Sequence, residues 1–177
     1  MKTLKRRRKE NRTNYLKRLK LLKSEKPRLV FRKSNKFLVA QYVESYEAKD
    51  KIVFGFNSKE LLKYSWPENF SGSLKSIPAA YLLGYLIGKK ILETKLEEPI
   101  VDFGMNQTLH KTKLFGFLKG LIDSGIKIEC KKEAFPEEDR ILGKSLKEDF
   151  SKYFNQVKTK INSSKDVVSK KKKEDKK

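Results

Sequence analysis

Two short apolar segments, separated by a polar link, dominate residues 28–43 of the chain. The first segment, residues 29–31, and the second, residues 37–43, are rich in β-branched and aromatic residues, which favour strands. The link at residues 33–36 holds lysine, serine and asparagine, and the last two are common in tight turns. The pattern therefore predicts a β-hairpin with a basic tip.

The segment before the hairpin has a helical pattern. Tyr15, Leu19 and Leu22 recur at the spacing of one helix face, and lysines and arginines fill the other faces. Pro27 ends this short basic helix, because proline inside a helix removes a backbone hydrogen bond and clashes with the preceding turn. Residues 1–12 show no apolar periodicity, so we expect them to be disordered until they meet a partner.

The remainder of the chain alternates short apolar runs with longer helical periods. In order, the predicted elements are a polar turn at 47–51, a strand at 52–56, a short helix capped by Ser58 and stopped by Pro67, a loop at 69–76, a helix at 79–94 opened by Pro78, a strand at 100–103, a loop at 104–110, a helix at 111–124 stopped by Gly125, a strand at 126–130, a helix start at 136–140 and a last helix at 145–157.

The order of these elements predicts the fold class. Strands that alternate with helices imply parallel pairing with right-handed crossovers. We therefore predict an α/β fold with a mixed sheet, in which antiparallel hairpin strands join parallel βαβ units and helices pack against the sheet. Ala79, Ala80, Gly84 and Gly88 are small enough to let the longest helix lie close against that sheet.

Charge is distributed unevenly along the 177 residues, whose formal net charge is +21. Residues 1–36 hold 16 lysines and arginines against Glu10 and Glu25, and residues 158–177 hold 9 lysines against 3 acidic residues, so the central part is almost neutral. Solubility requires only a modest net charge with both signs interspersed. We expect three regions, namely a basic arm with a short helix at 1–26, an α/β globular domain at 27–157, and a disordered lysine-rich tail at 158–177.

Two kinds of polyanion could bind such cationic extensions, a nucleic acid or an anionic membrane surface. A membrane would require bulky apolar anchors or a lipid, but Lys2 stands where myristoylation needs glycine, and the chain ends in lysine rather than in a prenylation box. The most apolar window, residues 79–88, is too short to span a bilayer. We therefore expect a nucleic acid partner and no membrane.

Single copies of cysteine and histidine limit the chemistry. Cys130 has no partner for an internal disulfide, which is typical of a reducing compartment, so we expect a cytoplasmic protein. Cys130 and His110 alone cannot form a metal cluster, and we expect no cofactor. Asp102 and Asp123 could be carboxylates of a metal-dependent nuclease, but no convergent set of acid, base and metal ligands accompanies them. We expect no enzymatic activity.

The order of several motifs resembles one protein family. The motifs are RRRKE at 6–10, TNY at 13–15, PRLV at 27–30, RKSNK at 32–36, PAAYL at 78–82, LKG at 118–120 with DSG at 123–125, and FPEEDRI at 135–141. Over residues 6–146 the chain resembles the L-eighteen family of large-subunit ribosomal proteins, in its archaeal and eukaryotic form. The loop at 105–113 and the segment at 142–145 depart from the family's usual pattern.

The resemblance implies a structural, non-catalytic protein that binds 5S ribosomal RNA in the central protuberance of the large ribosomal subunit. The implied partners are 5S rRNA, large-subunit rRNA and neighbouring large-subunit ribosomal proteins. The family's RNA contacts correspond here to Arg6, Arg7, Arg8, Lys9, Tyr15 and Arg18 in the arm and helix, and to Arg32, Ser34, Asn35 and Lys36 in the hairpin. An RNA-binding or chaperoning protein outside the ribosome would have the same charge layout and stays an alternative.

The chemistry of the side chains leads to the same region. Lysine and arginine neutralise phosphates, and arginine adds a planar fork that contacts two phosphate oxygens. The candidate RNA contacts therefore also include Lys5, Arg12 and Lys33, and Phe37 joins Tyr15 as a surface for base stacking. Each aromatic ring could instead pack against the protein, and the serine and asparagine of the tip could serve only the turn. We predict that the arm and the hairpin tip bind one RNA together.

Overall fold

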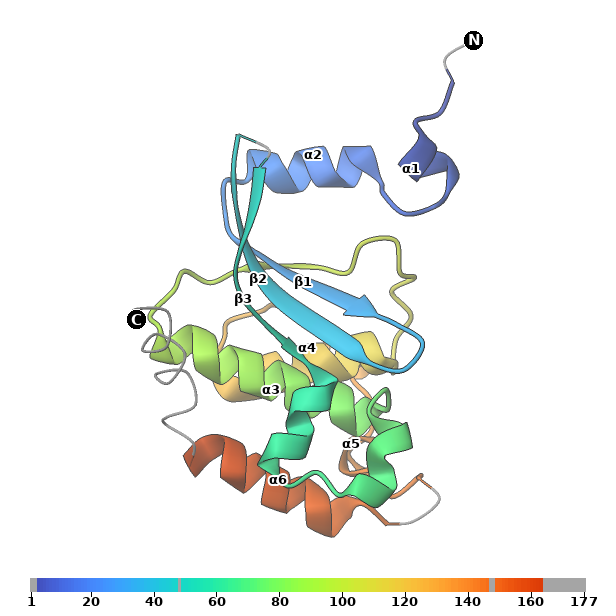
Figure 1. Cartoon of the computed structure of the whole chain (residues 1–177), viewed down its shortest axis with the longest axis vertical. Helices are drawn as coiled ribbons and strands as arrows, with labels where there is room; N and C mark the ends of the chain where they lie inside the picture. Colours follow the sequence, from blue (N-terminus) through green and yellow to red (C-terminus); the bar gives the residue numbers. More distant parts are fainter. Residues whose placement is uncertain (1–2, 48, 147–148, 164–177) are drawn as a thin grey trace, which may run out of the picture.

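The computed structural model describes residues 3–47, 49–146 and 149–163 of the chain. The described elements are α1 (Arg6–Lys9), α2 (Tyr15–Lys23), β1 (Arg28–Lys33), β2 (Leu38–Tyr46), β3 (Lys49–Asn57), the 3-10 helices η1 (Ser58–Tyr64) and η2 (Glu68–Ser73), α3 (Ile77–Glu93), β4 (Ile100–Asp102), α4 (Lys113–Ser124), the 3-10 turn η3 (Lys132–Ala134), α5 (Glu138–Leu142) and α6 (Ser151–Ser163). In Figure 1, α2 lies on one side of the sheet, and α3 and α4 lie on the other.

The four strands form one mixed sheet with the order β3-β2-β1-β4. β1 and β2 pair antiparallel, with Arg28 opposite Val43 and Lys33 opposite Leu38. β3 pairs antiparallel with β2, and β4 pairs parallel with β1, with Ile100 beside Arg28. The predicted α/β class, the hairpin and the third antiparallel strand are confirmed.

The two faces of β1 serve different purposes because successive side chains of a strand point to opposite faces. Leu29 and Phe31 are fully buried in the core, and the Phe31 ring lies 4.3 Å from the ring of Phe117 on α4, measured between centroids. Val30 and Arg32 point to the opposite, outer face, where α2 lies. The apolar face of the hairpin thus fixes which of its residues face the arm.

Glycines bring α3 and α4 into close contact with each other. A Cβ atom on Gly84 would lie 2.3 Å from the carbonyl oxygen of Phe117, and one on Gly120 would lie 2.1 Å from that of Tyr81. A Cβ on Gly88 would meet Ser124 of α4. The prediction that Gly84 and Gly88 face the sheet was wrong, because these glycines allow the backbones of two helices to approach.

The predicted strand at 126–130 is absent from the described structure, which leaves one parallel strand pair instead of successive βαβ units. Gly125 adopts a left-handed conformation at φ +111, and the backbone N–H of Ile126 returns to the carbonyl of Leu121. This arrangement ends helices with an apolar contact from the residue after the glycine. Ile126 is buried for that reason and not as part of a strand.

Several boundaries at the amino-terminal half differ from the predictions. Residues 6–9 form the helical turn α1 rather than a disordered segment. β3 begins at Lys49, inside the predicted polar turn. The cap of η1 is Asn57, whose side chain accepts from the N–H of Lys59, whereas the hydroxyl of Ser58 accepts from the N–H of Leu38. Most of the predicted loop at 69–76 belongs to η2.

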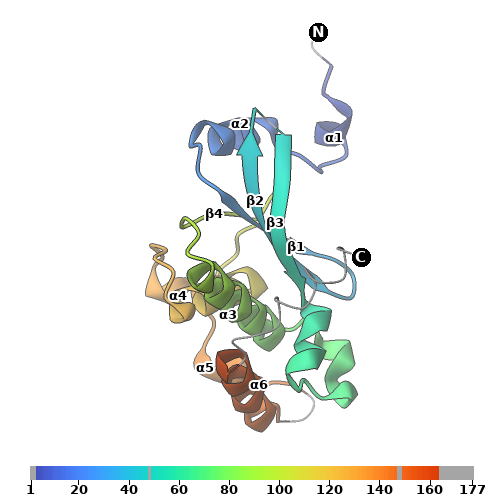
Figure 2. The ribbon, with the colours of Figure 1, turned by 60° about the vertical axis from the view of Figure 1, so that its left-hand side comes forward.

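The last helix, α6, begins later and ends later than the predicted helix at 145–157. Figure 2 shows it beneath α3, and its Phe154 ring lies 5.3 Å from the ring of Tyr81. Phe154, Val157 and Ile161 are buried, so residues 158–163 of the predicted tail belong to this packed helix. The rest of that tail, residues 164–177, lies outside the described residues.

Candidate nucleic-acid interface

The basic arm is held on the outer face of the sheet by polar contacts. No residue of α2 is buried within the described arm, and Leu16 and Leu19 are largely exposed. Arg18 pairs instead with Asp50 of β3 at 3.0 Å, and the ammonium group of Lys17 donates to the carbonyl of Gly104 at 3.4 Å. The arm is therefore positioned mainly by charge.

Asp50 is the anchor for two arginines from different elements. Its carboxylate lies 2.7 Å from the guanidinium of Arg28, whose side chain is only 5% exposed, and 3.0 Å from that of Arg18. Ser45 donates to the same carboxylate at 2.9 Å. Partial burial alone would raise the pKa of Asp50, but the hydrogen bonds from Ser45 and Arg28 and the charges of Arg28 and Arg18 lower it. Asp50 is thus ionised and joins α2 to the sheet.

Asp102 performs a similar task at the end of β4. Arg32 donates to its carboxylate at 2.9 Å and to its carbonyl at 2.8 Å, and the N–H of Gly104 donates to the second carboxylate oxygen at 2.8 Å. Burial would raise the pKa of Asp102, but these hydrogen bonds and the charges of Arg32 and Lys17 lower it. The loop-capping role of Asp102 follows directly, and its carboxylate also restrains Arg32.

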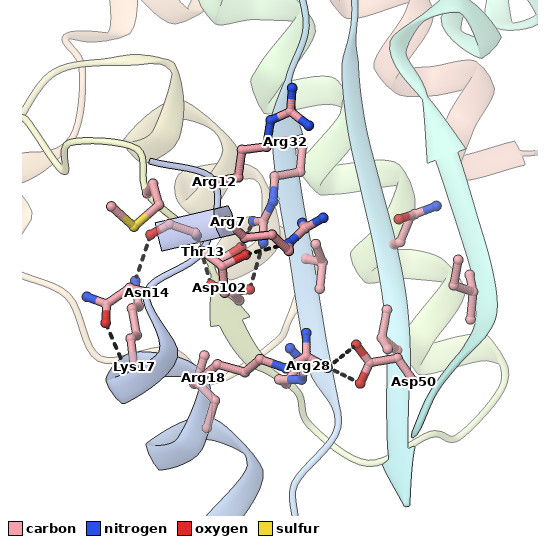
Figure 3. A pocket seen from close by; sticks show the side chains of 17 residues that line it. Arg7, Arg12, Thr13, Asn14, Lys17, Arg18, Arg28, Arg32, Asp50 and Asp102 are labelled. Atoms are coloured by element: carbon pink, nitrogen blue, oxygen red, sulfur yellow. Dashed lines mark hydrogen bonds and ion pairs between the residues drawn. The ribbon is translucent and has the colours of Figure 1, made fainter. Parts of the chain in front are cut away.

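A groove of about 280 Å³ lies between the arm and the outer face of the sheet. Figure 3 shows the arginines and the two carboxylates that converge on it. The groove is lined by six cationic side chains, Arg7, Arg12, Lys17, Arg18, Arg28 and Arg32, and by Asp50 and Asp102. We call this site the arm groove. Its positive charge exceeds its negative charge, as binding to a phosphate backbone requires.

The arginines of the arm groove are not equally committed to protein partners. Arg28 and Arg32 are bound to carboxylates that fix their positions. Arg7 donates only through Nε to the hydroxyl of Thr13 at 3.0 Å, and Arg12 pairs through Nε with Glu10 at 3.3 Å. These contacts leave the terminal nitrogens of Arg7 and Arg12 for a ligand. A guanidinium with two available nitrogens can bind phosphate in a bidentate manner.

The predicted site residues of the arm and helix occupy three positions. Four of the predicted residues line the arm groove: Arg7, Arg12, Arg18 and Arg32. Arg8 instead donates to the Sδ atom of Met105, and Lys5 lies over the ring of Tyr15 at 4.8 Å. Arg6 and Lys9 are exposed on α1, and Arg6 lies 3.8 Å from Glu10.

The hairpin tip, apart from Arg32, does not line the arm groove. The hydroxyl of Ser34 donates to the carbonyl of Phe37 and accepts from its N–H, so Ser34 closes the turn. Phe37 is half-buried against the core, and Lys36 is exposed. Lys33, Ser34 and Asn35 line a separate hollow. The structure thus joins Arg32 to the arm and places the tip elsewhere.

Sequence reasoning missed Lys17, Arg28 and Asp50 as members of this site. One signal for Arg28 was present, because residues two apart on a strand share a face and Arg28 is two pairs from the predicted Arg32. Lys17 lies among other cations of α2 with nothing in the pattern to distinguish it. Asp50 belongs to the predicted polar turn, and only the pairing of β2 with β3 brings it to Arg28.

Features typical of catalysis do not converge in the described part of the chain. No group of three or more His, Cys, Asp or Glu residues suited to a metal ion occurs among the described residues. Asp123 accepts from the hydroxyl of Tyr81 at 2.7 Å and pairs with Lys119, far from Asp102 in the fold. His110 is exposed and contacts the ring of Phe115 edge-on. Among the described helices, none has the length and apolar character needed to cross a bilayer.

Comparisons with known proteins point to a single family. Residues 1–101 match the family model described as "Ribosomal large subunit proteins 60S L5, and 50S L18". The chain is also 40% identical, over 141 residues, to a protein of Korarchaeum cryptofilum named "Large ribosomal subunit protein uL18". That alignment covers 80% of this chain and 70% of the relative.

Proposed function

Because this chain belongs to the family of ribosomal large subunit proteins described as 60S L5 and 50S L18, it is a structural constituent of the large ribosomal subunit and not an enzyme, and we propose that it binds 5S rRNA through the arm groove. Family membership also decides between a ribosomal protein and an RNA chaperone outside the ribosome, in favour of the former. The RNA and the site that binds it form the content of the proposal.

The observation that carries the proposal is the convergence of arm and sheet cations on one groove. Arginines from α1, from the segment after it, from α2 and from β1 line the same site, although they are up to 25 residues apart in sequence, from Arg7 to Arg32. Asp50 and Asp102 hold three of these arginines in place. A groove with fixed cations binds a phosphate backbone with less loss of side-chain freedom than a flexible arm does.

We assign the remaining arm residues to the same RNA. Arg6 and Lys9 project from α1 into solvent, where they can neutralise phosphates beside the groove. Tyr15 is half-buried beneath the ammonium of Lys5, and its free ring face can stack on an unpaired base. Residues 1–26 act in this proposal as the RNA-binding arm of the globular domain.

The bound 5S rRNA gives the protein its proposed place in the ribosome. We propose that the protein attaches 5S rRNA to the central protuberance of cytoplasmic ribosomes, where it also contacts large-subunit rRNA and neighbouring ribosomal proteins. The support for this assignment is the family match together with the arm groove.

The test is the variant Arg6→Ala/Arg7→Ala/Arg8→Ala, titrated against 5S rRNA at low salt. These arginines contact the rest of the protein only through exposed groups, so the variant should fold as the wild type does. We expect binding to weaken by about 3 kcal/mol, which is about 150-fold in Kd, because three charge-assisted contacts are lost.

A matched control removes three exposed cations from elements away from the arm, in the variant Lys63→Ala/Lys127→Ala/Lys152→Ala. Its loss of affinity should be small, since only the long-range attraction changes. Equal affinities of the arm variant and this control for 5S rRNA would contradict the proposal.

A further inference from the structure

A second cationic cluster lies at the end of the hairpin, on the other side of β1 from the arm groove. Lys33 is the last residue of β1, Lys75 lies just before α3, and Lys113 is the first residue of α4. Together with Lys111 and Arg140 they line a hollow of about 470 Å³. We call this site the hairpin-end hollow.

The hairpin-end hollow lacks the carboxylates that balance the arm groove. No acidic side chain is among the described residues that line it. Lys111 pairs with Glu137 at 3.1 Å outside the hollow, and Lys75 donates to the carbonyl of Asn35 at 3.2 Å. Within the described chain, Lys33 and Lys113 form no ion pair. Three ammonium groups from separate elements therefore meet without a counter-charge.

This arrangement is unfavourable for the free protein. Burial, and then the charges of Lys75 and Lys33, lower the pKa of Lys113 below its ordinary value, so the folded state disfavours its charged form. Nothing in the packing needs these charges, because an uncharged side chain of similar length could fill the same volume. A cost of this kind is offset when an anion enters the hollow.

We propose that the hairpin-end hollow binds a backbone phosphate of the same RNA as the arm groove, at a separate stretch of that RNA. The inference rests on the proposed function, since it assigns a second contact to the RNA bound there. Ser34, Asn35, Gln107 and Thr112 add polar groups to the three lysines, and phosphate oxygens accept hydrogen bonds from all of these.

The position of the hollow favours an RNA strand over an acidic protein segment. Arg32 and Lys33 are neighbours on β1 whose side chains point to opposite faces. The loop after β4 follows the same division, with Gly104 and Met105 lining the groove and Gln107 and Leu109 lining the hollow. One polyanion that passes around the end of β1 therefore reaches both sites.

The test uses the full chain with Lys33→Gln, Lys75→Gln and Lys113→Gln combined, and 5S rRNA titrated over a range of salt concentrations. Affinity at the lowest salt should fall about tenfold or more, and the slope of log Kobs against log salt should decrease by about 2, because each phosphate contact contributes about 0.7 to 0.9. Without RNA, the same variant should melt at a higher temperature than the wild type, because the repulsion is gone.

The control replaces Lys63, Lys127 and Lys152 with glutamine, which removes the same charge from exposed positions elsewhere. If the wild type binds 5S rRNA and the two variants have the same affinity and slope, the hollow is not an RNA site, while the proposed function stands. Loss of another ribosomal protein from the variant's complexes, with RNA binding intact, would also overturn the inference in favour of an acidic protein partner. A wild type that does not bind 5S rRNA would overturn both proposals.

Discussion

Replacing Asp50 with asparagine tests how the arm is attached to the sheet. Asp50 contacts Arg28 at 2.7 Å and Arg18 at 3.0 Å, so the substitution removes the negative charge from two ion pairs while keeping the size of the side chain. The two arginines differ in exposure, because the Arg28 side chain is 5% exposed and the Arg18 side chain is 38% exposed. The loss of stability should therefore come mainly from Arg28.

The magnitude follows from that difference in exposure. Removal of one partner from a fully buried pair costs about 3 to 5 kcal/mol, since a buried charge is left without compensation. Asp50 is itself 32% exposed, which lets water approach the guanidinium, and Ser45 still accepts from Arg28. We therefore expect Asp50→Asn to lower the free energy of unfolding by about 2 kcal/mol. Loss of the Arg18 pair contributes below about 1 kcal/mol, as for other pairs at the surface.

The assay is chemical denaturation of Asp50→Asn, Arg18→Gln and Arg28→Gln, together with the double variants of each arginine with Asp50→Asn. The coupling energy between Asp50 and Arg28 should exceed that between Asp50 and Arg18. The reasoning is refuted if Asp50→Asn unfolds within about 0.5 kcal/mol of the wild type, which is the effect of an ordinary surface substitution. Equal coupling energies for the two arginines would refute it as well.

Three further predictions concern packing and titration. Gly84→Ala should destabilise the protein by about 3 kcal/mol in a thermal or chemical melt, because the added Cβ would meet the Phe117 carbonyl oxygen, whereas Gly72→Ala, with nothing within 4 Å, should change stability little. Burial, and then the charges of Glu44 and Glu97, raise the pKa of Tyr42 to about 12, so stability should fall from its ordinary value of 10.0 upward as the unfolded chain ionises first. Tyr42→Phe should remove that part of the alkaline loss. The lowered pKa of Asp50 means that its pair stabilises the fold above the ordinary value of 3.8 and that this contribution disappears as the pH falls through the folded value, so Asp50→Asn should flatten the acid side of the stability profile.

The sheet could be predicted well from the sequence because its core face leaves a periodic signal. Leu29 and Phe31, two residues apart on β1, are both fully buried, and the turn residue Ser34 closes the hairpin as expected. The apolar residue Ile126 produced the one false strand. A buried residue after a helix-ending glycine looks the same as the start of a strand when only its hydrophobicity is considered.

The arm groove was less predictable because charged contacts leave no period in a sequence. α2 docks through Arg18 and Lys17, whose partners Asp50 and Gly104 lie 32 and 87 residues further along the chain. Composition identified the arm as cationic, and it could not indicate which arginines are bound to protein carboxylates. The division between the arm groove and the hairpin-end hollow likewise depends on how the loop after β4 passes β1.

The register of β1 links folding quality to RNA recognition. A shift of one residue in its pairing would turn Arg28 and Arg32 toward α3 and α4 and expose Leu29 and Phe31. The same slip would carry Lys33 to the face of the arm groove, so no misregistered form could keep one binding surface and lose only the other. A chain that binds its RNA at both surfaces has therefore already passed a test of strand alignment, and assembly into a ribonucleoprotein can discriminate against misfolded copies without a separate sensor.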